Sequence, residues 1–221
     1  MTVEEILAEL ALKGSERNRA GMSRFGINVS SAYGVSVGEI RALARRAGRS
    51  HELALALWAT GKHEARILAS IVDDPAKVSA AQMNAWIRDF DSWDLCDQCC
   101  QNLFDRTDYA WKKAAEWSGR KREFEKRAGF ALMASLAWHR KDAPDTAFLA
   151  FLPLIESADD DRNFVRKAVS WALRGIGKRN DGLRAAAIKT ARRMANGTKA
   201  QRWVSRDALR ELTSPAKSKP R

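Results

Sequence analysis

The feature that most constrains the fold is a long succession of short amphipathic segments with helical periodicity. The first of them, Val3–Leu12, has apolar residues at positions 3, 6, 7 and 10, which places them on one face of a helix. Stop signals follow several segments, among them Gly48, Gly61 and Asp73-Asp-Pro75. The alternation typical of strands is nearly absent. The pattern predicts an all-α protein.

We expect roughly twelve helices, mostly of 9–20 residues and joined by short turns. They cover residues 3–12, 37–47, 51–60, 63–72, 79–90, 92–104, 107–117, 120–140, 145–156, 161–175, 181–194 and 198–212, with a shorter helix and a loop between Gly14 and Gly34. Many short helices of similar length favour HEAT-like helical repeats that form a curved α-solenoid, and a compact bundle is the alternative. We predict a single domain over 1–213 and a basic, disordered tail over 214–221.

The positive charge is concentrated in the second half of the chain. The net charge is +12, but residues 1–110 carry 13 Lys+Arg against 15 Asp+Glu, whereas residues 111–221 carry 26 against 12. A polycationic half favours a polyanionic partner, with nucleic acid as the first candidate. The alternative is a soluble protein that is basic for no functional reason.

Other features point to the cytoplasm. No apolar run approaches the roughly 20 residues of a membrane span. The acidic, amphipathic N-terminus is not a signal peptide. Cys96, Cys99 and Cys100 are an odd number crowded on one segment, as expected in a reducing compartment.

The segment 92–104 contains the most unusual residue. At helical spacing Trp93, Cys96, Asp97, Cys100 and Phe104 share one face. With Ser92 as N-cap, Asp94 would lie in the first turn, where the helix dipole favours a carboxylate. Asp97 lies one turn further in, among apolar groups, where an unpaired charge is costly. Either it has a buried cationic partner or its face opens onto a cationic ligand.

Two further helices depart from plain amphipathic packing. Arg127 lies on a stripe of apolar residues within 120–140. Trp171 is flanked at helical spacing by Lys167, Arg174 and Lys178, which suits a tryptophan that contacts a sugar or base beside phosphates. Alternatively, Asp97 and Arg127 form a buried ion pair, the tryptophans are core residues and the basic groups are solvated.

Metal and cofactor sites find little support. The cysteines lack a second pair of ligands and point to different sides of one helix. The three histidines are scattered, and no phosphate-binding glycine motif follows a strand. We expect neither a metal nor a cofactor.

Three segments resemble the AlkD-like DNA alkylation-repair glycosylases, which are enzymes built from HEAT-like repeats. They are Trp93-Asp94-x-x-Asp97, Lys126-Arg127-Ala128 and the run from Phe164 to Arg174 that contains Arg166-Lys167-Ala-Val-Ser-Trp171. The resemblance implies a monofunctional alkylpurine DNA glycosylase that releases 3-methyladenine and 7-methylguanine from duplex DNA.

The resemblance also implies roles for individual residues. Asp97 would be the catalytic carboxylate, Trp93 and Trp171 would line the nucleotide, and Arg127 would contact the backbone phosphate at the lesion. The neighbouring basic residues, Arg166, Lys167 and Arg174, would bind DNA as well. A non-catalytic protein that binds damaged, bent or branched DNA is the alternative, and a protein-interaction scaffold is a third. We expect a monomer, because a solenoid needs no partner to bury its core.

Overall fold

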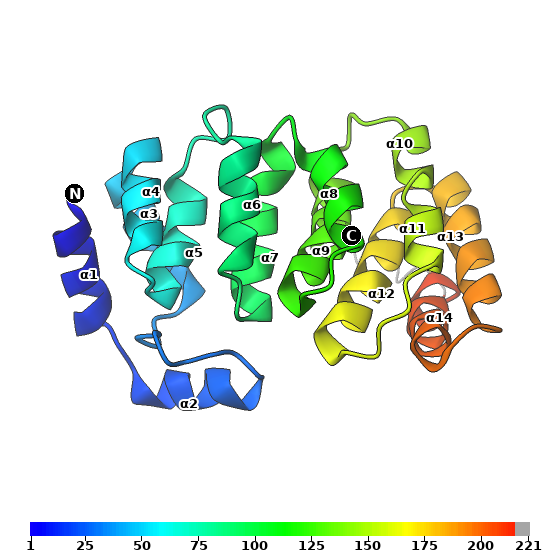
Figure 1. Ribbon diagram of the computed structural model, residues 1–221, viewed down its shortest axis with the longest axis horizontal. Coiled ribbons are helices and arrows are strands. Elements are labelled where there is room, and N and C mark those ends of the chain that lie inside the picture. The colour runs from blue at the N-terminus through cyan, green and yellow to red at the C-terminus, as the bar shows by residue number, and fades with distance from the viewer. Residues whose placement is uncertain (215–221) are drawn as a thin grey trace, which may run out of the picture. The chain divides into compact units, whose positions relative to one another are not determined.

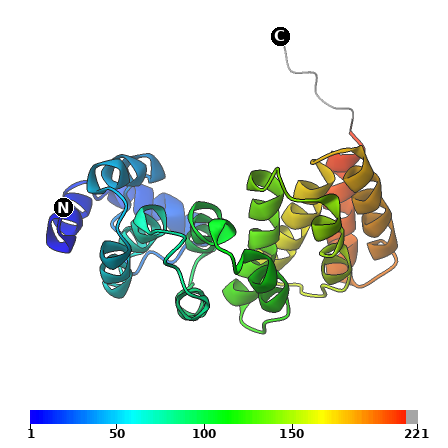
Figure 2. The ribbon, with the colours of Figure 1, turned by 90° about the horizontal axis from the view of Figure 1, so that it is seen from above.

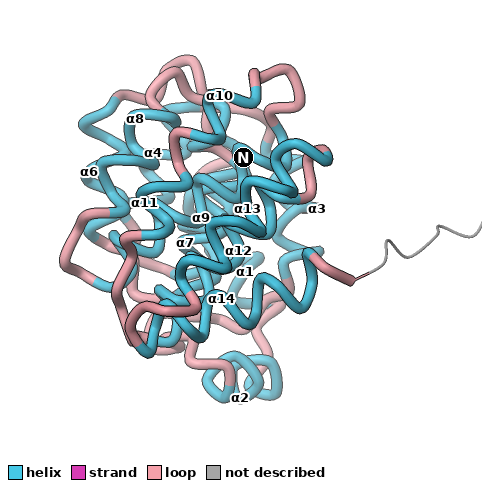
Figure 3. Tube along the Cα trace, turned by 90° about the vertical axis from the view of Figure 1, so that its right-hand side faces the viewer, coloured by secondary structure: helices cyan, strands magenta, loops and turns pink. Residues whose placement is uncertain are grey.

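Many of the helices have a Ser, Thr or Asn residue as N-cap, and short turns or loops connect one helix to the next (Figure 1). The computed structural model describes residues 1–214. Thr2, Ser36 and Thr198 each accept a hydrogen bond from the N–H three residues later, and a Glu or Gln side chain bonds back to the cap, which completes a capping box. The described residues contain helices and loops but no strand (Figure 3). The all-α prediction is confirmed.

The chain divides into two compact units, Met1–Ala110 and a second that begins at Trp111. The first contains α1 (Val3–Leu12), α2 (Glu16–Arg24), α3 (Val37–Ala47), α4 (His51–Ala59), α5 (His63–Val72), α6 (Ala80–Arg88), α7 (Trp93–Asn102) and the 3-10 helix η1 (Phe104–Arg106). The helix α8 (Ala110–Ser118) begins at the boundary, and α9 (Glu123–His139), α10 (Asp145–Leu149), α11 (Leu152–Glu156), α12 (Asn163–Gly177), α13 (Asp181–Met194) and α14 (Lys199–Leu212) follow it. The domain range 1–213 stays a prediction, and all but the first residue of the predicted tail, 214–221, lie outside the described residues.

In the first unit α5 and α7 lie side by side in the same direction. Their starts are joined by His63 and Asp94, and their ends by Ser70 and Asn102. A second layer contains α4 and α6, where the rings of Trp58 and Trp86 stack with 3.9 Å between centroids. The two layers bury an apolar core between them.

One helix of this unit belongs to neither layer. In Figure 1, α2 runs across the ends of its neighbours, and none of its residues is buried. It therefore contributes little to the core, and its position depends on hydrogen bonds at the ends of the segment.

The second unit repeats a parallel arrangement. Arg127 of α9 donates to the carbonyl of Phe164 at the start of α12, and further along Gly175 of α12 packs on Ala134 and Ala137 of α9. Ser170 of α12 in turn donates to Asp207 of α14 with 2.6 Å between oxygens. Most of these helices are seen nearly end-on in Figure 2. Consecutive parallel helices with a second layer behind them are the pattern expected of HEAT-like repeats.

Several helix boundaries differ from the predicted ones by a few residues. The helix predicted over 145–156 is two short helices, α10 and α11, and Pro153 in the first turn of α11 explains why a new helix begins there. The helix predicted from 107 begins at Ala110. Ser92 is the N-cap of α7 by position, but its side chain makes no capping bond and accepts one from the N–H of Asn28 instead.

Candidate functional site

A pocket of about 760 Å³ opens in the first unit beside Trp93 and Asp97. We call it the Asp97 pocket. Three parallel helices, α3, α5 and α7, line one side of it with Val37, His63, Ile67 and five residues of α7. The opposite wall comes from α2 and the loops around it. The complete lining comprises Arg17, Asn18, Gly21, Met22, Arg24, Phe25, Ile27, Val35, Ser36, Val37, His63, Ile67, Trp93, Asp94, Asp97, Gln98 and Gln101.

The face of α7 that contains Asp97 changes character along the helix. Cys96, Cys100 and Phe104 are fully buried, whereas Trp93 and Asp97 are half-buried and line the pocket. The face of α7 that carries this carboxylate therefore opens onto a cavity. Burial raises the pKa of the Cys99 and Cys100 thiols well above the usual range, so these cysteines serve as core residues.

Trp93 is held by the N-terminal segment. Its indole Nε1 donates to the backbone carbonyl of Phe25 at 3.0 Å. Three residues later, Asn28 donates its backbone N–H to Ser92 Oγ at 2.9 Å and its side-chain amide to Asp91 at 2.7 Å. The loop that follows α2 is thus bonded to the start of α7 at three points, which fixes one wall of the pocket relative to the other.

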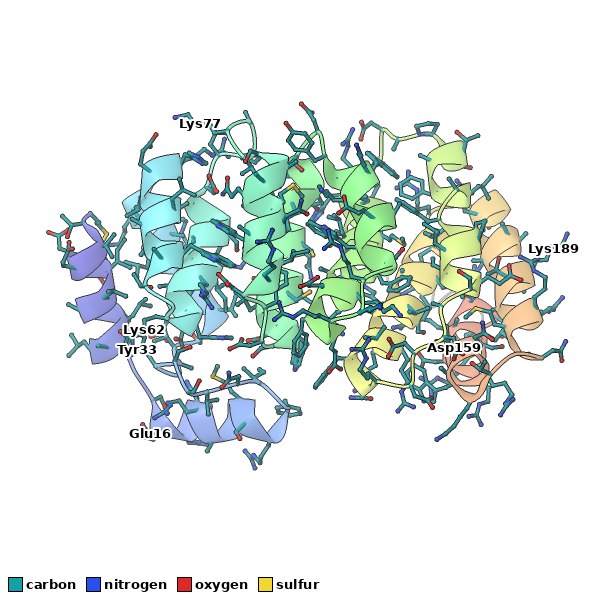
Figure 4. All side chains as sticks on the ribbon, viewed as in Figure 1. Glu16, Tyr33, Lys62, Lys77, Asp159 and Lys189 are labelled. Carbon is teal, nitrogen blue, oxygen red and sulfur yellow. The ribbon has the colours of Figure 1, made fainter. Side chains whose placement is uncertain are left out.

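The other end of this segment is tied to a buried carboxylate. Glu64 is 1% exposed, and its two oxygens accept the backbone N–H groups of Tyr33, Gly34 and Val35 at 2.7–3.1 Å. Gly34 has φ +85°, and an added Cβ would fall 2.3 Å from the carbonyl oxygen of Ser15. Only glycine fits this close approach. Figure 4 shows Tyr33 beside Lys62, whose Nζ lies 5.6 Å from the ring centroid, and Glu16 on α2.

A second carboxylate, Asp94, lies in the same pocket and is bonded to a histidine. His63 is 2% exposed, and its Nε2 lies 2.8 Å from Asp94 Oδ2. Burial by itself lowers the pKa of His63, but the hydrogen bond and charge of Asp94, with the charges of Glu64 and Asp91, raise it above 6.5. Asp94 does lie in the first turn of α7, as predicted, but its partner is this imidazole. The scattered histidines of the sequence gave no signal for the pair.

The residues predicted from the second half of the chain lie in the second unit. Arg127 is 6% exposed and its guanidinium donates to the Phe164 carbonyl. Trp171 is half-buried on α12. Of the basic residues around it, Lys167 is exposed, and Arg166 lies with its guanidinium carbon 4.7 Å from the centroid of the Trp203 ring.

The basic face of α12 is interleaved with carboxylates from α14. Arg174 forms an ion pair with Glu211, and its Nε lies 3.7 Å from Asp207 Oδ2. Lys178 is also paired with Glu211. Although burial alone would raise it, the pKa of Glu211 is lowered because Lys178 and Arg174 bond to it. Sequence spacing placed these cations on one face but did not reveal the acids that neutralise them.

Asp97 and Trp93 are therefore brought together in one pocket, and Arg166, Lys167, Trp171 and Arg174 share one helix. The residues that sequence patterns missed come mainly from α2 and its C-cap, namely Arg17, Met22, Arg24 and Phe25. Among the described residues no group of three potential metal ligands occurs, and no helix is long and apolar enough to cross a bilayer.

Comparisons with known proteins give the family and the fold of the chain. A comparison with curated proteins gives no match at a significant level. One solved structure superposes with a TM-score of 0.75 over 95% of each chain at 20% identity, and its protein is described as one of a new family related to the HEAT-like repeat DNA glycosylases, with affinity for branched DNA structures. This likeness establishes the HEAT-like fold. The family model for the DNA alkylation repair enzyme matches residues 6–212. The chain therefore belongs to the DNA alkylation repair enzyme family.

Proposed function

We propose that this protein is a monofunctional DNA glycosylase. It would hydrolyse the N-glycosidic bond of cationic N3- and N7-alkylated purines, such as 3-methyladenine and 7-methylguanine, in duplex DNA and leave an abasic site. The observation that carries the proposal is the half-buried carboxylate of Asp97, one helical turn from Trp93 in the wall of a pocket. Membership of a DNA alkylation repair family supports it.

Hydrolysis of an alkylated purine nucleotide is assisted by a carboxylate and requires no group that donates a proton to the leaving base. An N3- or N7-alkylated purine already carries a positive charge, so it leaves without protonation. As the glycosidic bond breaks, positive charge develops on the deoxyribose, as in other glycosyl transfers. A fixed carboxylate nearby stabilises that charge and orients the attacking water. Asp97 takes this role.

Trp93 contributes a different interaction. Its indole N–H is bonded to the Phe25 carbonyl, which holds the ring in the wall of the pocket. The quadrupole of a tryptophan ring attracts a cation by about 0.5–2 kcal/mol. The pocket volume of about 760 Å³ lies within the range of small-molecule sites and has room for a nucleoside.

The second unit supplies the contacts to the DNA backbone in this proposal. Arg127 would bind the phosphate at the lesion, and Trp171 would lie against the nucleotide. Lys167 is exposed, so it reaches phosphates directly, and Arg166 contacts DNA beside Trp203. Arg174 is paired with Glu211, so a phosphate must displace that carboxylate. We therefore expect Lys167 to contribute more to binding than Arg174.

The test is base release from methylated duplex DNA by the wild type and by Asp97→Asn, with the freed purines separated by chromatography. We expect release by the wild type, a loss of at least about 100-fold in Asp97→Asn, and nearly unchanged DNA affinity. Asp161→Asn removes an exposed carboxylate of the second unit and serves as the matched control. Full activity of Asp97→Asn would disprove the mechanism.

A second candidate is a non-catalytic protein that binds damaged, bent or branched DNA. The affinity for branched DNA of the protein in the similar solved structure favours it. It predicts salt-sensitive DNA binding and no base release by either form. In both cases the partner is duplex DNA, and we propose a cytoplasmic monomer.

A further inference from the structure

Three arginines of the first unit form a row along α3. Arg41 and Arg45 lie one turn apart on one side of α3, and Arg49 follows directly after the C-cap Gly48. All three are exposed, and together they line a shallow hollow of about 340 Å³ with Ile71 and Val72 at the end of α5. We call these three residues the arginine row.

The row is not neutralised within the protein. Arg46, the neighbour of Arg45, pairs with Glu9 at 2.7 Å. In the part of the chain that the structure describes, none of the three arginines of the row forms such an ion pair. The unit as a whole has 13 Lys+Arg against 15 Asp+Glu, so the row is a local concentration of positive charge in an acidic unit. Like charges at this spacing repel one another unless an anion lies between them.

The row begins beside the Asp97 pocket. Arg41 Nη2 donates to Asn102 Oδ1 at 3.1 Å and to Gln98 Oε1 at 3.4 Å, both on α7. Gln98 also lines the pocket. The pocket includes the starts of α3 and α5, at Val37 and His63, and extends along α7 to Gln101, whereas the hollow of the arginine row reaches the end of α5 at Val72.

The dimensions and chemistry of the row fit one strand of a nucleic acid. From Arg41 to the end of α3 at Ala47 the helix rises by about 9 Å, which is the axial rise of two to three nucleotides of a strand, and Arg49 lies beyond that end. A guanidinium binds phosphate oxygens with two parallel hydrogen bonds. Beyond Arg49 the next hollow, of about 400 Å³, contains Asp74 and Asp108 as well as Arg106, so the uninterrupted positive surface ends there.

We propose that the arginine row binds backbone phosphates of duplex DNA on one side of the Asp97 pocket. We take DNA as the ligand because of the proposed function, so this part of the inference rests on it. The inference extends the DNA-binding surface into the half of the chain whose net charge is negative. It also assigns a direction to the DNA strand, which leaves the pocket along α3.

The test uses undamaged duplex DNA, so that it does not depend on base release. Affinity is measured by fluorescence anisotropy at several salt concentrations for the wild type, Arg45→Gln/Arg49→Gln and Arg46→Gln. Each phosphate contact contributes about 0.9 to the slope of log K against log salt concentration. We expect the double variant to lose about 1.8 from this slope and to bind more weakly. Arg46→Gln changes charge at the next residue but should leave the slope nearly unchanged, because Arg46 is paired with Glu9.

A second double variant, Arg45→Lys/Arg49→Lys, should keep most of the slope, because it keeps the charge. If Arg45→Gln/Arg49→Gln and Arg46→Gln have the same slope as the wild type, the proposal is overturned. Base release is measured separately. If the double variant has a smaller slope but the wild type releases no base, the proposal for the arginine row stands and the glycosylase proposal is rejected. If the wild type releases bases but the slope of the double variant is unchanged, the glycosylase proposal stands and the proposal for the arginine row is rejected.

Discussion

His63 and Asp94 form a hydrogen-bonded pair in the wall of the Asp97 pocket, with 2.8 Å between Nε2 and Oδ2. The pair joins the start of α5 to the start of α7, the helix that positions Trp93 and Asp97. The protonation of one histidine therefore affects the helix that carries the proposed catalytic carboxylate.

The first prediction concerns the pH dependence of stability. The pKa of His63 is raised above 6.5 in the folded protein, so its charged form stabilises the fold at pH values below 6.5. This contribution is lost as the pH rises through the folded-state pKa. We expect His63→Gln to lower the free energy of unfolding more at about pH 5.5 than at about pH 8.5, as measured by urea denaturation. His139→Gln, which alters an exposed histidine of the second unit, is measured for comparison. An effect of His63→Gln that is equal at both pH values would contradict the assignment.

The second prediction concerns the anchor of the N-terminal segment. Trp93→Phe removes the hydrogen bond to the Phe25 carbonyl and should cost about 0.5–1.5 kcal/mol of local stability. Backbone amides of α2 should then exchange faster with deuterium, while those of α5 keep their protection. Trp138→Phe alters a tryptophan that is 71% exposed and is the matched control. Unchanged exchange in α2 after Trp93→Phe would show that this bond does not hold the segment.

The third prediction concerns a close contact between α8 and α9. A Cβ at Gly129 would lie 2.3 Å from the backbone nitrogen of Ser118, which cannot move without displacing α8. Gly129→Ala should therefore destabilise the protein by about 1–3 kcal/mol. Gly119→Ala, where the nearest atom is 3.8 Å away, should change stability by less than about 0.5 kcal/mol. Chemical denaturation of the two variants compares them, and equal midpoints would reject the steric argument.

The fourth prediction concerns acid stability of the second unit. Arg162 donates two side-chain hydrogen bonds to Asp160 and Lys126 Nζ lies 3.1 Å from it, which joins the starts of α9 and α12. Chiefly because of Arg162, and despite burial, the pKa of Asp160 is lowered from 3.8 to about 2. The stabilisation is present above pH 3.8 and is lost as the pH falls through about 2.

We expect Asp160→Asn to cost about 1.5–3 kcal/mol at neutral pH, because a charge-assisted network is lost. The difference from the wild type should shrink in acid. Acid unfolding followed by circular dichroism measures it, with Asp161→Asn, an exposed neighbour, as the reference. A constant difference between pH 7 and the acid transition would argue against the ionised network.

Local signals in the sequence account for much of the fold. Caps such as Ser36 and Thr198 and the stops at Gly48 and Gly61 act within one or two helical turns, so they can be read directly. The break between α10 and α11 was missed, because the five helical residues on each side of it share one apolar pattern. Periodicity also singled out Asp97 among apolar neighbours, and the structure places it at a cavity.

Contacts between distant residues explain what the sequence did not reveal. The pairing of Arg174 with Glu211 joins residues 37 positions apart, and His63 and Asp94 are 31 apart. The position of α2 depends on Glu64 and on the Trp93 anchor rather than on an apolar face of its own. The arginine row was not predicted, because the net charge of residues 1–110 is slightly negative and does not show where the individual charges lie.

The hydrogen bonds between Glu64 and residues 33–35 hold α2 in place, so the residues of α2 that line the pocket are not needed for the stability of the core. The α2 wall of the Asp97 pocket carries Arg17, Met22 and Arg24, yet it contributes no residue to the apolar core. Mutations on this helix can therefore alter which ligands the pocket accepts at little cost to folding. The carboxylate side of the pocket, built on the buried helix α7, has no such freedom. Ligand selectivity can therefore change through mutations on the α2 wall while the wall that carries Asp97, the proposed catalytic residue, stays constant.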